Sequence, residues 1–322
     1  MWKRFWRAAR ARTASASDAA GVTPASKSPR NEATVVAERA AALLRGGVPP
    51  RRAFAVLGAD AARSSPTGVI AARVADGVPV ASALAATDAP EWRVLAVAWK
   101  LAEDSGAPLA PALQRIGYAL RELDQLRERR SVLLAGPRAT VRMVAALPIL
   151  ALLLGLLLGF DPIPVLFSST GVLIAAVGIG LLGVGVHWSR AMQRRSANDD
   201  RIAGLALELT WVALGGGAPP AAALKDVVNR VDHYGAEWVA FDGFRSGSAL
   251  VTTIAAAESA GVPIRPLLLE QADAERVGSS AEQERDAERL GVRVLLPLGI
   301  CVLPSFIVLG VLPVVLSMFG AL

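Results

Sequence analysis

The sequence has few of the residues on which most metal and catalytic sites depend. Its 322 residues include one cysteine, Cys301, and two histidines, His187 and His233. A single cysteine excludes a disulfide within the chain and a cysteine-based metal site. Cys301 stands in an apolar run, where a small buried side chain is expected. Neither histidine has a second ligand at metal-binding spacing, and no serine or cysteine stands with a partner that would make it a nucleophile. The sequence therefore predicts no catalytic residue, no metal site and no cofactor.

Aromatic residues are also scarce, at 5% of the chain, while Ala, Val, Leu, Arg and Gly dominate. Alternating β-branched and aromatic residues, which favour strands, are missing, and the abundant residues favour helices packed through small side chains. The composition is apolar for a soluble protein, with 53% hydrophobic residues and a mean hydropathy of +0.43. We therefore expect an all-α protein with part of its surface in lipid.

Three long apolar runs are the segments expected to lie in lipid. Residues 294–322 carry no ionisable side chain except the thiol of Cys301, and the runs 139–160 and 165–188 are joined by only four residues. Each is long enough to cross a bilayer core as a helix, which takes roughly 20 residues. The sequence predicts an integral membrane protein with a transmembrane hairpin at 139–188 and a third transmembrane helix at 294–322.

Basic residues flank these runs on one side only. The net charge is +6, and the hairpin turn has an aspartate, Asp161, but no lysine or arginine. Such an asymmetry indicates membrane topology and contact with anionic lipid. We do not expect nucleic-acid binding. The asymmetry predicts a multi-pass protein of the cell membrane with a cytoplasmic N-terminus and an external C-terminus. The clusters are Arg138 and Arg142, then Arg190, Arg194 and Arg195, then Arg285, Arg289 and Arg293.

Residues 1–31 form a basic tail that starts with Trp2, Phe5 and Trp6. No apolar stretch follows these residues, so the tail is not a cleavable signal peptide. Two interpretations stay open, a disordered segment or a short helix lying on anionic lipid, and the aromatic residues favour the lipid contact.

Two cytoplasmic helical domains are predicted, at residues 32–138 and 189–293. Glycine just after a helix and proline at the start of the next are a recurrent helix boundary. A stripe of leucines and Ile116 at three- and four-residue steps then marks a long amphipathic helix from residue 109. The boundaries fall at Gly46-Gly47 before Pro49-Pro50, Gly77-Val78-Pro79, Gly106-Ala107-Pro108, Gly215-Gly216-Gly217 before Pro219-Pro220, and Gly261-Val262-Pro263.

The two domains share an order of parts. The stretch 41–50, AALLRGGVPP, matches 210–220, TWVALGGGAPP, and 102–113, AEDSGAPLAPAL, matches 257–268, AESAGVPIRPLL, without a gap. A charged helix and then an apolar run follow in both copies. The chain therefore contains an internal duplication, and the second copy lacks the short helix that Pro79 opens in the first.

This twice-occurring arrangement resembles the type II secretion system F domain family, the membrane platform proteins of type II secretion and of type IV and Flp (Tad) pili. The end of the chain, 291–315, is similar to actinobacterial proteins of the TadC/TadB type. The resemblance covers roughly residues 35–322. The family often has glycine before the motif glutamate, where this chain has Ala102 and Ala257, a departure that weakens the match to the secretion-system members more than to the Tad members.

The resemblance implies a scaffold in the inner membrane that couples a cytoplasmic hexameric ATPase to the assembly of pilin subunits, with a second F-type platform protein as a further partner and a homo- or hetero-oligomer as its working form. The scaffold itself would not be an enzyme, because the sequence has no phosphate-binding G-x-x-x-x-G-K-[ST] loop. The alternative function is a transporter or channel subunit that works as an oligomer. Apart from Arg142 at the edge of the first run, the three predicted spans contain no charged side chain, and three such helices are a poor basis for a transport pathway.

Residues for partner contact come from the motif turns and from two charge-rich helix faces, 121–130 and 276–293. Glu103 and Glu258 stand near helix C-termini, where an acid opposes the helix dipole, so each is expected to form an ion pair within the chain or with a partner. G-x-G-x-x-G at 178–183 lies inside an apolar run without a preceding strand, so it predicts close helix packing rather than dinucleotide binding. The candidate contact residues are Glu103, Gly106, Glu258, Gly261, Arg127, Arg130, Arg285 and Arg289.

Overall fold

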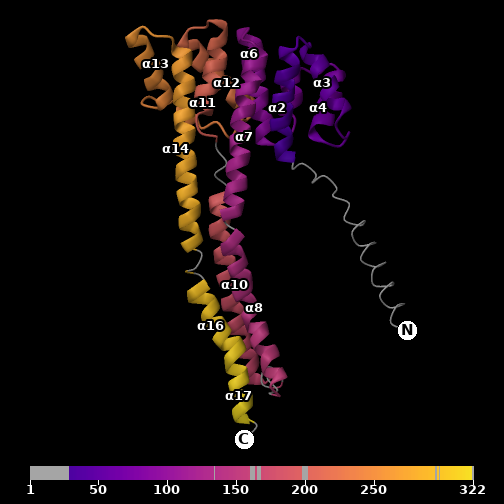
Figure 1. Ribbon diagram of the computed structural model, residues 1–322, viewed down its shortest axis with the longest axis vertical. Coiled ribbons are helices and arrows are strands. Elements are labelled where there is room, and N and C mark those ends of the chain that lie inside the picture. Colours follow the sequence, from indigo (N-terminus) through magenta and orange to yellow (C-terminus); the bar gives the residue numbers. More distant parts are fainter. Residues whose placement is uncertain are drawn as a thin grey trace, which may run out of the picture. The chain divides into compact units, whose positions relative to one another are not determined.

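The computed structural model describes residues 29–133, 135–159, 164, 168–197, 202–293, 296 and 298–320. Every regular element in these ranges is a helix (Figure 1). The chain divides into two compact units. One consists of residues 1–100 and 108–118, and the other of residues 101–107 and 119–322. The predicted basic tail falls almost entirely outside the described residues, and so does most of the hairpin turn.

The first unit contains α2 (Pro29–Arg45), α3 (Pro50–Ala59), α4 (Pro66–Ala75), α5 (Val80–Ala85), most of α6 (Pro90–Ser105) and the start of α7 (Leu109–Leu133). Its core is built around the rings of Phe54 and Trp99, which meet edge to face with centroids 5.5 Å apart. Trp92 and Ile70 are fully buried beside other apolar side chains. Helix α3 starts at Pro50, as predicted, because proline needs no backbone hydrogen bond in the first turn.

Helix α4 was not predicted from the sequence. Ser65 caps it by accepting a hydrogen bond from the backbone N–H of Gly68 at 3.2 Å. Helices α3 and α4 pack closely because Gly58 faces Ala71, and a Cβ on Gly58 would overlap the methyl group of Ala71.

The second unit contains a group of packed helices with charged side chains on its surface. It includes α11 (Leu205–Ala213), the 3₁₀ turn η1 (Leu214–Gly216), α12 (Pro220–Tyr234), η2 (Phe241–Phe244), α13 (Ala249–Ala260) and α14 (Ile264–Arg293). Helix α11 packs against α12 and α14, and α13 packs against α14 (Figure 1). Helix α11 is almost wholly buried, which explains its apolar sequence LALELTWVA. Proline opens α12 and a glycine follows α13, as the sequence pattern predicts, and a further glycine, Gly235, ends α12.

The same unit contains the apolar helices. They are α8 (Ala135–Leu157), α10 (Ser169–Ala197) and a C-terminal segment with two π-helical turns. That segment comprises η3 (Leu298–Val302), α16 (Leu303–Phe306), η4 (Ile307–Val311) and α17 (Leu312–Gly320). Among the described residues, two stretches are long and apolar enough to cross a membrane, Gly171–Ser189 and Gly299–Leu316. In α8 the apolar stretch found among the described residues is shorter, Ala146–Leu157.

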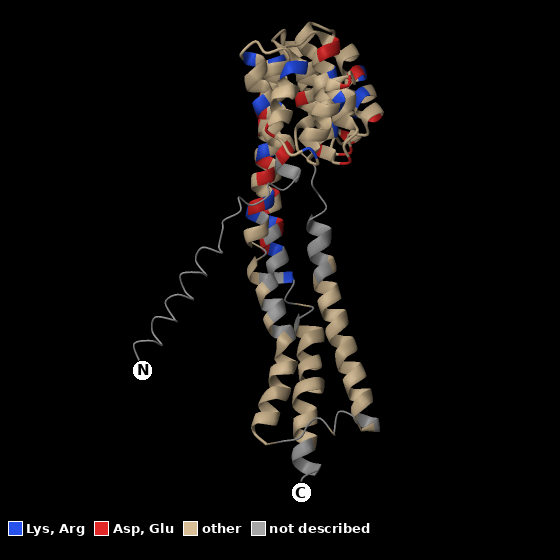
Figure 2. Ribbon diagram, turned by 90° about the vertical axis from the view of Figure 1, so that its right-hand side faces the viewer, with Lys and Arg blue, Asp and Glu red and all other residues tan. Residues whose placement is uncertain are grey.

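The surface of these helices is apolar. Among their described residues, none from 143 to 189 or from 296 onward is Lys, Arg, Asp or Glu, whereas such residues are scattered over the other helices of this unit (Figure 2). Large side chains such as Leu153, Leu157 and Ile179 are more than half exposed. Exposed apolar patches of this extent indicate a non-aqueous surrounding. These helices therefore have the surface expected of membrane helices.

Small residues set the packing between the apolar helices. A Cβ on Gly178 of α10 would overlap Leu309, and one on Gly155 of α8 would lie 2.8 Å from Cγ2 of Val314. The prediction that the G-x-G-x-x-G stretch serves helix packing is confirmed at Gly178. Gly180 and Gly183 have open space around them in the described part of the chain.

One buried hydrogen bond joins α10 to the C-terminal segment. The hydroxyl of Ser305, which is fully buried, donates to the carbonyl oxygen of Gly178 at 2.7 Å. We expect Ser305→Ala to lower the free energy of unfolding by about 0.6–1.5 kcal/mol, since interhelical hydrogen bonds in membranes contribute in this range. Thermal unfolding in detergent measures it. Ser189→Ala is the control, because the Ser189 hydroxyl donates to the carbonyl oxygen of Gly185 within its own helix, and equal melting temperatures for both variants would contradict the assignment.

Candidate functional site

A cluster of four charged side chains lies inside the second unit, where α7, α11 and α14 approach one another. Arg276 of α14 forms an ion pair with Glu208 of α11. Its Nε lies 3.5 Å from Oε2 of Glu122 on α7, and its Nη1 lies 3.6 Å from Oδ1 of Asp273. The side chain of Arg276 is 7% exposed, and that of Glu208 is 0% exposed. One guanidinium therefore connects carboxylates from three helices.

Burial makes the charges of this cluster unfavourable unless each has a close partner of opposite charge. Removing a charge from water costs several kcal/mol, which only close partners of opposite charge repay. An arginine cannot escape the cost by losing its proton. Three carboxylates surround Arg276, and two of them, Glu122 and Asp273, keep part of their contact with solvent. Glu208 has none, so its charge depends on Arg276.

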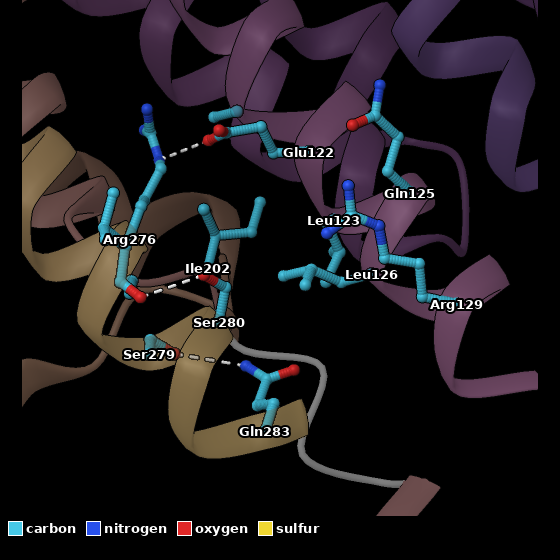
Figure 3. A pocket seen from close by; sticks show the side chains of 13 residues that line it. Glu122, Leu123, Gln125, Leu126, Arg129, Ile202, Arg276, Ser279, Ser280 and Gln283 are labelled. Carbon is cyan, nitrogen blue, oxygen red and sulfur yellow. Dashed lines mark hydrogen bonds and ion pairs between the residues drawn. The ribbon is translucent and has the colours of Figure 1, made fainter. Parts of the chain in front are cut away.

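A pocket of about 130 Å³ lies next to this cluster. Figure 3 shows Arg276, Ser279, Ser280 and Gln283 on one side and the residues of α7 opposite them. The polar groups on α14 are engaged within their own helix, because Gln283 donates to Ser279 and the Ser280 hydroxyl donates to the carbonyl of Val277. Small-molecule sites usually occupy 300–1,000 Å³. The pocket therefore has the size of a gap between two helices rather than of a substrate site. From α7 its lining includes Glu122, Leu123, Gln125, Leu126 and Arg129.

Two further contacts hold α7 within this unit. Arg129 of α7 forms an exposed ion pair with Glu284 of α14 at 3.1 Å. Arg127 pairs with Asp124 at 3.3 Å, and its guanidinium lies 5.1 Å from the ring centroid of Trp238. Trp238 belongs to the loop after α12 and is almost buried. The long helix α7 is thus joined to α14 at two levels and to the loop at a third place.

The first motif turn, residues 102–107, is not a free surface feature. Asp104 forms an ion pair with Arg230 of α12 at 2.7 Å. The carbonyl group of Ser105 lies where a Cβ on Gly216 would be, and the Cβ of Ala107 lies 2.6 Å from that of a side chain built on Gly215. Glycine at both positions is therefore required for the turn to pack on η1. Of the predicted contact residues here, Glu103 is exposed, and Gly106 has a φ of +72°.

The second motif turn is exposed. Glu258 stands near the end of α13, and Gly261 ends that helix with a φ of +64°. The structure thus places Glu103 and Glu258 in turns of the same kind with different surroundings.

The predicted arginines also differ in their surroundings. Arg127 is partly buried and engaged by Asp124 and Trp238. Arg285 and Arg289 are exposed on α14, and Arg289 lies 3.6 Å from Asp286. The side chain of Arg130 lies outside the described residues. Arg285 and Arg289 are therefore accessible to a partner in solution.

Sequence reasoning missed the central residues, Glu208 and Arg276. Arg276 was assigned to a charge-rich helix face, and the structure buries it instead. A signal for Glu208 was present, because it is the only charged residue in the apolar helix Leu205–Ala213. An acid in a buried helix requires a basic partner, although the sequence does not say which arginine provides it.

Glu275, next to the cluster, is expected to affect the stability of the fold in a way that depends on pH. Burial raises the pKa of its carboxyl group, and a hydrogen bond from the backbone of Gly204 lowers it by a smaller amount. A carboxyl group whose pKa is higher in the folded state stabilises the fold below its unfolded pKa of about 4.3, and this contribution is lost as the pH rises through the folded pKa.

We therefore expect Glu275→Gln to melt about 1–3 °C higher than the unaltered protein at pH 7.5, and the difference to vanish below about pH 4. Thermal unfolding across this pH range measures the effect. Glu270→Gln on the exposed side of the same helix is the control. A difference that grows toward acidic pH would have the wrong sign.

The architecture is that of a helical protein with polar helical domains and outward-facing apolar helices. Residues 36–157 match the family model for the type II secretion system (T2SS), protein F. The match starts in α2 and ends with the last residue of α8, so it joins a helical domain to the first apolar helix. No curated protein sequence matches the chain. A T2SS protein F domain is therefore present in the first half of the chain, which supports the resemblance to that family.

Proposed function

We propose that this protein is an inner-membrane platform of a Flp (Tad)-type pilus or of a related secretion machine. The observation that carries the proposal is the protein F match, which covers a helical domain together with the apolar helix that follows it. The repeated sequence motifs support a second F-type copy in residues 189–293. The similarity of residues 291–315 to TadC/TadB-type proteins favours the Flp pilus.

The proposed topology has three spans. The apolar stretches of α10 and of the C-terminal segment provide two of them, and α8 with the residues after it provides the third. The positive-inside rule then puts both helical domains in the cytoplasm and the C-terminus outside. In this arrangement the polar helices meet cytoplasmic partners and the apolar helices meet lipid and pilin.

The charge cluster gives the platform a means of transmitting movement. Helix α7 leads into α8, and α14 leads toward the C-terminal apolar segment. Arg276 and the Arg129–Glu284 pair connect α7 with α14. A displacement of the cytoplasmic helices by a hexameric ATPase would therefore move both membrane connections together. The ATPase would hydrolyse ATP, and this chain would transfer the resulting force to pilin subunits.

Co-purification tests the proposal. We expect a secretion-type ATPase to be retained with the tagged full-length protein from detergent extracts of the native membrane. Deleting the gene should abolish pili or secretion and release the ATPase from the membrane. Intact pili and normal ATPase recruitment in the deletion strain would overturn the proposal.

The motif glutamates provide a second test. We expect Glu103→Lys and Glu258→Lys each to abolish pilus assembly without loss of the protein from the membrane, because each would remove an exposed acid from a motif turn. Glu270→Lys changes the same charge on the exposed face of α14 and serves as the control. Normal assembly in both motif variants would leave these glutamates as ordinary surface residues.

A further inference from the structure

An open groove lies between α7 and α14 and extends from the Arg129–Glu284 ion pair toward the ends of both helices. Its volume is about 510 Å³, compared with about 130 Å³ for the pocket beside Arg276. This volume falls within the range of 300–1,000 Å³ that is usual for ligand pockets. The groove can therefore take several side chains of an occupant. Its described lining consists of Gln125, Glu128, Arg129, Val132 and Leu133 from α7 and of Glu284 and Glu288 from α14.

Two apolar side chains line the α7 side of the groove without a cover. Val132 is 68% exposed and Leu133 is 43% exposed. Both follow the charged stretch 121–130 and precede the apolar run that starts at residue 139. Covering such side chains removes apolar surface from water, which is favourable. An occupant that carries apolar side chains of its own would therefore fit this part of the groove.

The groove also has an excess of carboxylates. Three of its described lining residues are acidic, and Arg129, the one basic residue among them, already pairs with Glu284 at 3.1 Å. Glu128 and Glu288 are exposed, and neither forms an ion pair within the part of the chain that the structure describes. An anionic lipid surface repels carboxylates, so lipid head groups are a poor cover for this groove. A basic segment is the complementary occupant.

The sequence of this chain contains such a segment at its start, MWKRFWRAARAR, residues 1–12. These residues include five Lys or Arg and no Asp or Glu. The spacing of Trp2, Phe5 and Trp6 is one that a helix would place on a single face. The segment thus combines aromatic side chains, which suit the apolar part of the groove, with positive charges, which suit its carboxylates.

The chain between this segment and α2 is long enough to let the segment reach a distant surface. Sixteen residues, 13–28, separate it from Pro29, where α2 begins. An extended chain of this length spans up to about 55 Å, whereas a small domain is about 30 Å across. The sequence between the segment and the end of α7 has no apolar run of membrane-spanning length. The segment and the groove therefore lie on the same side of the bilayer.

We propose that residues 1–12 of this chain lie in the groove between α7 and α14. The aromatic rings cover Val132 and Leu133, and the basic side chains pair with Glu128 and Glu288. In this position the segment closes the groove to other ligands and contacts both helices that lead toward the apolar segments. The inference does not depend on the proposed role in pilus assembly.

Photo-cross-linking in the full-length protein tests this placement. The substitution Trp6→p-benzoylphenylalanine keeps an aromatic side chain, and the protein is irradiated in membranes of phosphatidylcholine and phosphatidylglycerol. We expect mass spectrometry to find the main adduct with residues 125–133 or 284–288, in a band that migrates as one molecule. The same probe at Ala20, outside the basic segment, is the control and should not mark the groove.

Charge reversal tests the contact itself. Glu128→Lys combined with Glu288→Lys should lower the amount of this adduct about tenfold, because like charges that face one another repel. Adding Arg4→Glu and Arg7→Glu to the same chain should restore most of it, which a variant that had lost its fold could not do.

The matched control is Glu270→Lys combined with Glu282→Lys, since both residues are exposed on α14 outside the groove lining. This variant should give as much adduct as the unaltered protein. The proposal is wrong if the main adduct is with lipid or with another part of the chain, if it joins two molecules, or if the lysine variant of the groove forms it undiminished. Pili and ATPase recruitment play no part in these measurements, so their failure is distinguishable from failure of the proposed function.

Discussion

Arg276→Met is expected to destabilise the second unit by about 3–5 kcal/mol, the largest effect of any single substitution considered. The change leaves the carboxylate of Glu208, which has no contact with solvent, without the guanidinium that neutralises it. Breaking a buried pair by removing one partner costs this much because the remaining charge stays buried. Thermal unfolding in detergent and protease resistance in the membrane measure the loss.

The double variant Arg276→Met with Glu208→Leu separates charge from packing. Replacing a whole buried pair with apolar groups of similar volume is often neutral or stabilising, so we expect the second change to recover most of the lost stability. Arg289→Met is the matched control, since Arg289 is exposed and its pair with Asp286 should contribute at most about 1 kcal/mol. If Arg276→Met and Arg289→Met melt alike, the buried ion pairs of Arg276 do not stabilise this unit more than an exposed pair does.

Gly216→Val is expected to release the first motif turn from η1. The new side chain would occupy the position of the Ser105 carbonyl group, so either the turn or η1 must move. Overpacking of a close contact costs about 1–3 kcal/mol, and the displaced turn would also lose the Asp104–Arg230 ion pair. Thermal unfolding measures the loss of stability. Faster proteolysis within residues 102–107 measures the displacement of the turn.

Gly46→Val is the control because it makes the same change at the corresponding position of the first repeat. Nothing outside its own helix approaches Gly46 among the described residues, so a loss below about 1 kcal/mol is expected. The two substitutions together test the repeat alignment. Equal losses at both positions would mean that the close approach at Gly216 does not distinguish them.

Much of the helical pattern could be predicted from the sequence because glycine and proline act locally. Helices begin at Pro50, Pro90 and Pro220, and α13 ends at Ala260 before a glycine in the left-handed conformation. These boundaries depend on the allowed backbone angles of one or two residues. They do not require any knowledge of the tertiary structure.

What escaped prediction depends on contacts between distant residues. Arg276 belongs by sequence to a charged helix face, and only the approach of α11, with Glu208 68 positions earlier, buries it. Helix α4 escaped because its start, Ser65-Pro66, has a serine cap and no glycine directly before the proline. The sequence predicts that residues 102–107 contact another protein, whereas most of this turn packs against residues of its own unit.

The two π-helical turns have a consequence for the end of the chain. Pro304 and Pro313 lack the N–H groups that would bond the carbonyls of Ile300 and Leu309, and each of these carbonyls lies within a π turn. A π turn holds one more residue than an α turn, so the residues after it are displaced by one position, about 100°, from the α-helical periodicity of the residues before it. Deleting one residue from η3 would restore the ordinary winding and leave Ser305 facing Gly178, because the π turn accommodates one extra residue without turning the segments around it. Which residues of the last helix face its neighbours is thus set by two local changes of winding and not by the periodicity of the helix before it.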